Sequence, residues 1–186
     1  MSSTWQYDTT ANVWSQLSPP HWPSARRNGG AVYSAAHGGI VLFGGQDNSL
    51  TKFDDAWVYD SGDWQPLATP VRPAPRTDFG FAADSLQGNV VLYGGVFGNA
   101  LDDTWLLTGS TWVQLQTSGP GPRTAPSMEF DPSRGLSILV GGAGLTDQAE
   151  LTWEFDGNAW SSVNTLTLRT CGDPTRRPCG TQTGES

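Results

Sequence analysis

Val90-Val91-Leu92-Tyr93-Gly94-Gly95 decides the fold, because close variants of this stretch occur twice more along the chain. Residues 40–45 read Ile-Val-Leu-Phe-Gly-Gly, and residues 137–142 read Ser-Ile-Leu-Val-Gly-Gly. The first glycines of successive pairs are 50 and then 47 residues apart. An apolar run that returns at this interval predicts a repeated supersecondary unit, which must stack on its neighbours to bury its faces.

Two further motifs return with the same period. Each glycine pair follows the arginine of a Pro-x-x-Arg motif by 18 residues, and this offset is the same in all three units. Downstream, three tryptophans recur at intervals of 48 residues, and each precedes a second tryptophan by seven residues. Trp5 and Trp14, spaced by nine, form a fourth pair. The recurring residues are Arg26, Arg76 and Arg123, then Gly44, Gly45, Gly94, Gly95, Gly141 and Gly142, then Trp57, Trp64, Trp105, Trp112, Trp153 and Trp160.

Within one unit, four runs of strand length are rich in branched and aromatic residues. The clearest set lies at residues 79–83, 89–93, 104–107 and 111–115. A glycine-rich link and turn residues such as Thr108-Gly109-Ser110 separate these runs, and helical periodicity is absent. Four short strands in a meander predict an all-β fold built of propeller blades.

These motifs together resemble the kelch repeat family. The resemblance rests on Leu-Phe-Gly-Gly or Leu-Tyr-Gly-Gly, on Asp-Asp-x-Trp at residues 54–57 and 102–105, and on the second tryptophan of each unit. It covers residues 4 to about 163 and implies a β-propeller of kelch-type blades with four antiparallel strands each. In the third unit, Glu150-Leu151-Thr152-Trp153 replaces the acidic motif. The expected parts are residues 1–20 as the outer strands of an incomplete blade, residues 21–67, 71–115 and 120–163 as complete blades, and residues 164–186 as a polar tail that contains cysteines.

The number of units predicts a partial or incompletely closed propeller. Propellers close with about four to eight blades, and three blades plus a half are too few. The chain is therefore expected to be a portion of a longer kelch protein. Closure by two chains is an alternative, as is an inner strand from residues 165–170 beside the N-terminal half blade. Open blade edges would otherwise favour self-association.

The recurring residues are interpreted first as structural. Paired glycines let the backbone turn and let neighbouring segments approach closely. The tryptophans supply large apolar areas for packing between sheets, although stacking on a sugar is an alternative. The arginines and the Asp-Asp pairs have opposite charges at constant separation, which predicts ion pairs between strands or blades.

Composition excludes several partners. The formal net charge is −8 and Lys52 is the single lysine, so neither nucleic acid nor an anionic membrane surface is expected to bind. No apolar stretch of 18 residues is present. His21 and His37 lie far from Cys171 and Cys179, so no metal site and no cofactor are predicted. A disulfide between the cysteines is plausible for a secreted parent protein, but no signal peptide is recognised and the location stays open.

Catalytic motifs are not found, so a noncatalytic module is predicted. Adjacent aspartates on a strand point to opposite faces and cannot act together on one atom. The alternatives are the noncatalytic portion of a galactose-oxidase-type enzyme and a sialic-acid epimerase, both of which use kelch-like blades. An epimerase would use arginines at the pore, for which the candidates are Arg26, Arg27, Arg76 and Arg123.

Binding through loops on one face is the leading functional prediction, because the loops vary while the blades repeat. By resemblance to kelch proteins, the expected partner is a protein, and carbohydrate is an alternative. Phe97 is the sharpest candidate, since an exposed aromatic residue can act as a hot spot. The predicted contact residues are Asp47, Asn48, Lys52, Phe97, Asn99, Leu145 and Asp147.

Overall fold

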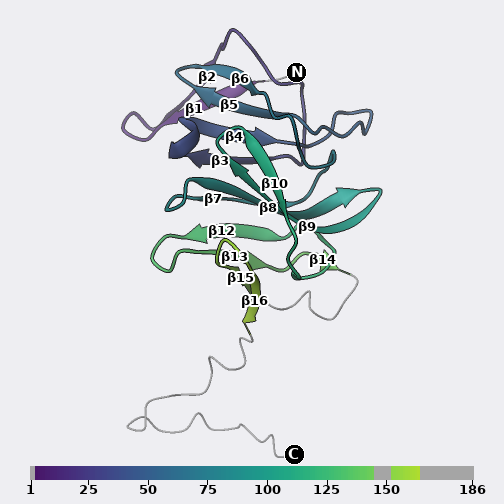
Figure 1. Ribbon diagram of the computed structural model, residues 1–186. Helices are drawn as coiled ribbons and strands as arrows, with labels where there is room; N and C mark the ends of the chain where they lie inside the picture. Colours follow the sequence, from purple (N-terminus) through teal and green to yellow (C-terminus); the bar gives the residue numbers. More distant parts are fainter. Residues whose placement is uncertain (1–2, 145–151, 164–186) are drawn as a thin grey trace, which may run out of the picture.

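A computed structural model describes residues 3–144 and 152–163, which form a series of antiparallel sheets (Figure 1). The N-terminal hairpin consists of β1 (Thr4–Asp8) and β2 (Val13–Leu17). Sheet 1 contains β3 (Gly30–Ser34), β4 (Gly39–Phe43), β5 (Ala56–Asp60) and β6 (Asp63–Leu67). Sheet 2 contains β7 (Gly80–Asp84), β8 (Asn89–Phe97), β9 (Asn99–Thr108) and β10 (Thr111–Leu115). Sheet 3 contains β12 (Ser127–Asp131), β13 (Leu136–Val140), β15 (Thr152–Phe155) and β16 (Trp160–Val163). The short strands β11 (Arg123–Thr124) and β14 (Ala143–Gly144) pair with each other, and a 3-10 turn spans Ala35–His37.

Aspartates at strand ends help to form the tight turns of these meanders. The carboxylate of Asp84 accepts the backbone N–H groups of Leu86 and Gln87, both at 2.9 Å, in the turn between β7 and β8. Asp8 and Asp156 bond in the same way to the two N–H groups that follow them two and three residues later. A short acidic side chain can satisfy turn donors that no strand partner reaches, so these residues specify where each strand reverses.

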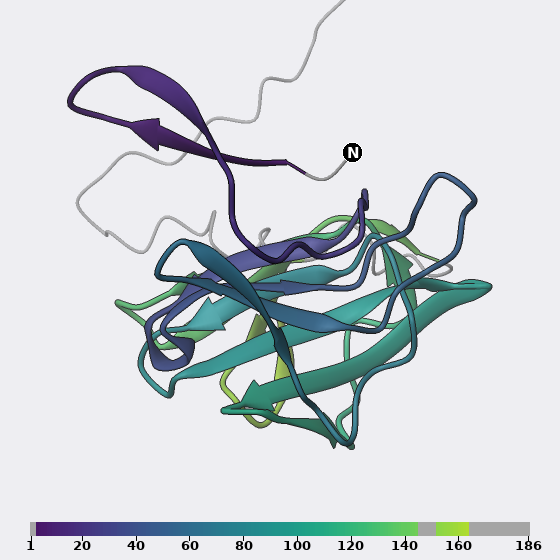
Figure 2. The same cartoon turned by 90° about the horizontal axis from the view of Figure 1, so that it is seen from above.

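The three four-stranded sheets stack face to face, in the order in which they occur in the sequence. Their first strands, β3, β7 and β12, lie side by side, and the later strands extend outward from them (Figures 1 and 2). Each of these three sheets is a simple meander, and none of them closes on itself within the residues that the structure describes. The predicted fold class is therefore confirmed: three complete four-stranded antiparallel blades and a two-stranded half blade form a partial propeller. Within the described residues, no helix has the length and apolar character needed to cross a membrane.

The hydrophobic core lies between the sheets. Val41 and Phe43 of sheet 1 are fully buried against sheet 2, where Trp112 is only 1% exposed. The rings of Phe43 and Trp112 are 5.1 Å apart. Tyr93 occupies the equivalent place between sheets 2 and 3, with its ring 4.9 Å from that of Trp160. The second tryptophan of a sheet therefore packs on the preceding sheet, which explains why one returns in every unit.

The indole N–H groups of these tryptophans reveal a difference between the interfaces. Trp160 donates to the hydroxyl of Thr104, and Trp64 donates to the hydroxyl of Thr4, both at 2.9 Å. Ala56 occupies the position of these threonines in the strand register of sheet 1. The buried Nε1 of Trp112 consequently has no hydrogen-bond acceptor within the described part of the chain.

Strands β8 and β9 are longer than the sequence indicated. Residues 89–93 were expected to form a strand that ends before a glycine-rich loop, but β8 continues to Phe97 and pairs with β9 to the tip of the hairpin. The register shifts between Tyr93 and Gly95, where both glycines of the pair have positive φ. The chain bends at this irregularity, and the pairing between β8 and β9 continues beyond it.

The N-terminal hairpin differs from the rest because it is almost wholly exposed. Trp5 and Trp14 hold the register positions of Trp57 and Trp64, but the turn between β1 and β2 is two residues longer. Figure 2 shows the hairpin standing away from the three sheets. The hydrogen bond from Trp64 to Thr4 joins it to sheet 1.

Candidate interaction face

The variable loops gather at one end of the molecule, here called the loop face. It comprises the connections from β4 to β5 and from β8 to β9, together with the segments that lead into β3, β7 and β12. In an antiparallel meander, alternate connections fall at the same end of the sheet, so these segments from distant parts of the sequence become neighbours. The remaining turns, including residues 85–88, lie at the opposite end.

The loop from β4 to β5 is organised by Asp47. Its Oδ1 atom accepts the backbone N–H groups of Ser49 at 2.9 Å and Thr51 at 2.8 Å. Isolated bridges link Gln46 to both Arg27 and Lys52. The predicted contact residue Asp47 thus also shapes the loop, leaving Oδ2 without a hydrogen bond within the described residues. Asn48 is exposed and Lys52 is half-buried.

Phe97 lies at the tip of the β8–β9 hairpin. It is 51% exposed, and Gly98, with φ of 76°, forms the turn to the exposed Asn99. The base of the hairpin is held on its inner side, because Thr77 exchanges backbone hydrogen bonds with Val96. Strand β11 packs against both β8 and β9. Phe97 is therefore an exposed aromatic side chain on a supported strand rather than in a free loop.

The remaining residues of the loop face only partly match the contact residues predicted from the sequence. Leu145 and Asp147 lie outside the described residues, so their predicted contacts stay predictions. Leu50 was not selected, yet it is exposed and has φ of 65°, which displays an apolar side chain at the loop tip. Arg27 is exposed beside Asp47 and lines a pocket of about 370 Å3 with it. Exposure at a loop tip depends on the turn geometry, which the sequence did not reveal.

Beneath the loop face, an arginine is bonded to an aspartate in each of the first two sheets. The guanidinium of Arg76 contacts both carboxylate oxygens of Asp103 at 2.6 and 2.8 Å, and it also donates to the Gly94 carbonyl at 2.9 Å. Trp105 donates its indole N–H to the same carboxylate at 2.6 Å. Arg26, Asp55, Gly44 and Trp57 repeat this arrangement in sheet 1. The recurring motifs of the sequence are thus neighbours in space.

These contacts keep the carboxylates ionised. Burial raises the pKa of Asp103, but hydrogen bonds from Arg76 and Trp105 and the charge of Arg76 outweigh it, so the pKa lies below its ordinary value of 3.8. Burial also raises the pKa of Asp55, but the hydrogen bonds and charge of Arg26 outweigh it, so this pKa is lowered as well. A paired and hydrogen-bonded carboxylate is poorly suited to take up a proton near neutral pH.

The glycine pairs permit close approach between successive sheets. A Cβ on Gly44 would lie 2.8 Å from the carbonyl oxygen of Arg76, and one on Gly94 would lie 2.9 Å from that of Arg123. Gly45 donates its N–H to the same Arg76 carbonyl at 2.9 Å. The first two pairs therefore each receive the Pro-x-x-Arg segment of the next unit, a link between repeats that the constant spacing alone did not identify.

The third unit keeps only part of this arrangement. Arg123 donates to the Gly141 carbonyl at 2.9 Å, as its counterparts do. Leu151, which lies outside the described residues, takes the sequence position of the aspartate. The buried Nε1 of Trp153 has no acceptor among the residues that the structure describes.

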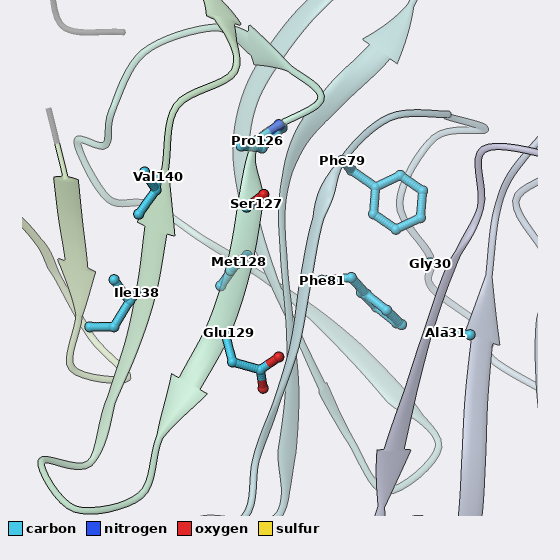
Figure 3. A pocket seen from close by; sticks show the side chains of 10 residues that line it. All are labelled: Gly30, Ala31, Phe79, Phe81, Pro126, Ser127, Met128, Glu129, Ile138 and Val140. Carbon is cyan, nitrogen blue, oxygen red and sulfur yellow. The ribbon is translucent and has the colours of Figure 1, made fainter. Parts of the chain in front are cut away.

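A groove of about 530 Å3 runs along the first strands of the three sheets (Figure 3). Phe79, Phe81, Met128 and Ile138 give it an apolar lining, with Glu129 as its charged residue. The four arginines considered for an epimerase do not line it. Within residues 3–144 and 152–163, no group of three potential metal-binding side chains occurs.

The paired aspartates of the Asp-Asp-x-Trp motif face different partners. Asp55 binds Arg26, whereas Asp54 contacts Arg72 at 3.1 Å. The two side chains thus point in different directions, although both residues precede β5 and lie outside the strand.

Comparison with known proteins agrees with this architecture. The KLHDC2/KLHL20/DRC7 Kelch-repeats domain family model matches residues 1–179. A search among curated proteins found no match. The family match extends over nearly the whole sequence, and each of the three sheets has a glycine pair, an arginine and two tryptophans at equivalent positions. The chain therefore belongs to this Kelch-repeats domain family.

Proposed function

We propose that this protein is a noncatalytic interaction module whose loop face binds another protein. The observation that carries the proposal is the exposed Phe97 at the tip of a hairpin that is held by Thr77 and β11. A rigidly presented aromatic side chain loses little conformational freedom on binding, so it is well suited to fill a pocket on a partner.

Polar residues on the loop face would contact the partner around Phe97. Asp47, Asn48, Lys52 and Asn99 belong to the same face, and Leu145 and Asp147 are proposed contacts in the third unit. Polar groups around an apolar centre are typical of protein interfaces. The partner that we propose presents an apolar pocket with polar groups at its rim.

The absence of catalysis is the second part of the proposal. Arg26 and Arg76 use their guanidinium groups within the fold, where each binds a carboxylate and a glycine carbonyl. An arginine held in this way is a poor candidate for binding substrate. Assays with sugars and alcohols, with and without added copper, should therefore show no turnover, and turnover lost in Arg76→Ala would contradict this part.

Site-specific photo-crosslinking tests the binding proposal. A photoreactive phenylalanine analogue is placed at position 97, and a matched one at position 86, where Leu86 is 65% exposed at the opposite end. We expect one protein to crosslink at position 97 and not at position 86. Purified, that protein should bind Phe97→Ala at least tenfold more weakly than the wild type, and Leu86→Ala should bind normally. Equal crosslinking at both ends, or unchanged binding by Phe97→Ala, would refute the proposal.

A further inference from the structure

The contact between successive sheets has two halves that recur with the repeat. The donor half is the second tryptophan of a sheet, such as Trp160, which donates to Thr104 and packs on Tyr93. The receiving half is this threonine with the aromatic residue beside it on the preceding sheet. Trp64 donates to Thr4 in the same way, although the hairpin has no strand that corresponds to β8.

The N-terminal hairpin carries an unused donor half. Trp14 lies opposite Tyr7, just as Trp64 lies opposite Tyr59, so it holds the donor position. However, Trp14 is 64% exposed, and its ring contacts that of Tyr7 at 5.0 Å. Trp5 and Tyr7 are also exposed. Contiguous aromatic side chains in water typically mark an interaction site.

Sheet 3 carries a receiving half that no tryptophan of the described residues occupies. Thr152 lies opposite Val140, just as Thr104 lies opposite Tyr93. Val140 is 49% exposed and Thr152 is half-buried. Within the described residues, the hydroxyl of Thr152 makes no hydrogen bond. Figure 3 shows Val140 on β13, next to the groove. Its neighbour Leu139 is buried against Val91 and Tyr93 of sheet 2, so Val140 lies on the opposite face of sheet 3.

Within the described residues, the two halves lie at opposite ends of the array (Figure 1). We propose that they meet between copies: Trp14 of one copy packs on Val140 of another and donates its indole N–H to Thr152. This contact would repeat between two chains the arrangement that Trp160 makes with Tyr93 and Thr104 inside one chain. Because the two surfaces differ, the assembly is head to tail and forms rings or open chains.

Charge makes this contact weaker than those inside the chain. Glu154 on sheet 3 holds the register position of Val58 and Leu106, and it pairs with Arg134 at 2.6 Å. Each copy also has a formal net charge of −8, so two copies repel each other at low ionic strength. We therefore expect a reversible association that becomes stronger as salt is added.

Sedimentation velocity of the full chain over a range of concentrations tests the proposal, with Trp14→Ala and Val140→Asp as the variants. Each should self-associate at least tenfold more weakly than the wild type. Tyr33→Ala and Val113→Asp change other exposed side chains and serve as matched controls that should associate normally. Unchanged thermal unfolding midpoints will show that the variants remain folded.

Mixing the two variants gives the decisive result. Trp14→Ala keeps a normal receiving surface, and Val140→Asp keeps a normal donor, so one heterologous contact survives in the mixture. We expect a 1:1 complex from the mixture although neither variant associates alone. A wild type that stays monomeric at every concentration would overturn the proposal. So would a mixture that fails to associate, or a Val140→Asp variant that associates like the wild type.

Discussion

Replacing Ala56 with threonine should give the indole N–H of Trp112 a hydrogen-bond acceptor. Ala56 is 3% exposed and lies where Thr4 and Thr104 accept indole hydrogen bonds, whereas Trp112 is buried with no acceptor for Nε1 in the described structure. A buried donor without a partner costs about 1–3 kcal/mol. A threonine hydroxyl at this position would supply the acceptor.

The added volume opposes this gain, so the comparison must separate the two effects. Inserting carbon atoms into a packed interior typically costs about 1–3 kcal/mol. Ala56→Val has nearly the same shape as Ala56→Thr but brings no acceptor, which makes it the matched control. We expect the threonine variant to be about 1–2 kcal/mol more stable than the valine variant, a difference that corresponds to the recovered hydrogen bond.

Urea unfolding followed by tryptophan fluorescence measures this difference, and thermal unfolding should agree with a shift of about 2–4 °C per kcal/mol for a domain of this size. The reciprocal change provides a second comparison. Thr104→Val removes the acceptor of Trp160 at constant shape and should cost about 1–3 kcal/mol. If Ala56→Thr is no more stable than Ala56→Val, the role assigned to the threonine hydroxyl is wrong.

Three further predictions concern the contacts within and between sheets. Asp103→Asn should lower the free energy of unfolding in urea by about 3–5 kcal/mol, because it leaves the buried charge of Arg76 without its partner. Asp55→Asn should lower it less, since the Asp55 carboxylate is more exposed. The pKa of Asp103 is lower in the folded protein than its ordinary value of 3.8. The ionised carboxylate therefore contributes its full stabilisation above pH 3.8, and this contribution is lost as the pH falls through the folded pKa. Acid titration should consequently destabilise the wild type more than Asp103→Asn. Gly30→Ala should cost about 1–3 kcal/mol in thermal unfolding, because its Cβ would lie 2.7 Å from the ring of Phe81, and an unchanged midpoint would contradict this packing.

The sequence predicted those parts of the fold that repeat. The glycine pairs, arginines and tryptophans keep nearly constant spacing, and each unit places them in one register, so the blade architecture and the charge pairing could be inferred together. The missing acceptor for Trp112 also had a sequence signal. Position 56 is alanine, whereas the three residues at the same register in the other units, Thr4, Thr104 and Thr152, are threonines.

The parts that were missed depend on contacts between distant segments. Glycine disfavours strands, so Gly94 and Gly95 indicated that β8 would end, yet Thr77 and β11 support the strand beyond them. The exposure of Leu50 depends on the turn that the Asp47 carboxylate stabilises. Neither effect is visible in the local sequence, because each requires a partner whose position is set by the folded chain.

The separation between structural and variable residues would allow the proposed binding and the stability of the fold to change independently. Arg76 binds Asp103 and the Gly94 carbonyl, and its own carbonyl is bonded to Gly45 of the preceding sheet, so the connection between sheets uses none of the loop-tip side chains. Replacing Phe97 should therefore alter a partner contact without loosening the stack. In the described part of the chain, the same construction places Trp14 at one end of the array and Val140 at the other (Figure 1), the two surfaces that we propose to meet between copies. Blade stacking within one chain and association between chains would then depend on the same tryptophan contact.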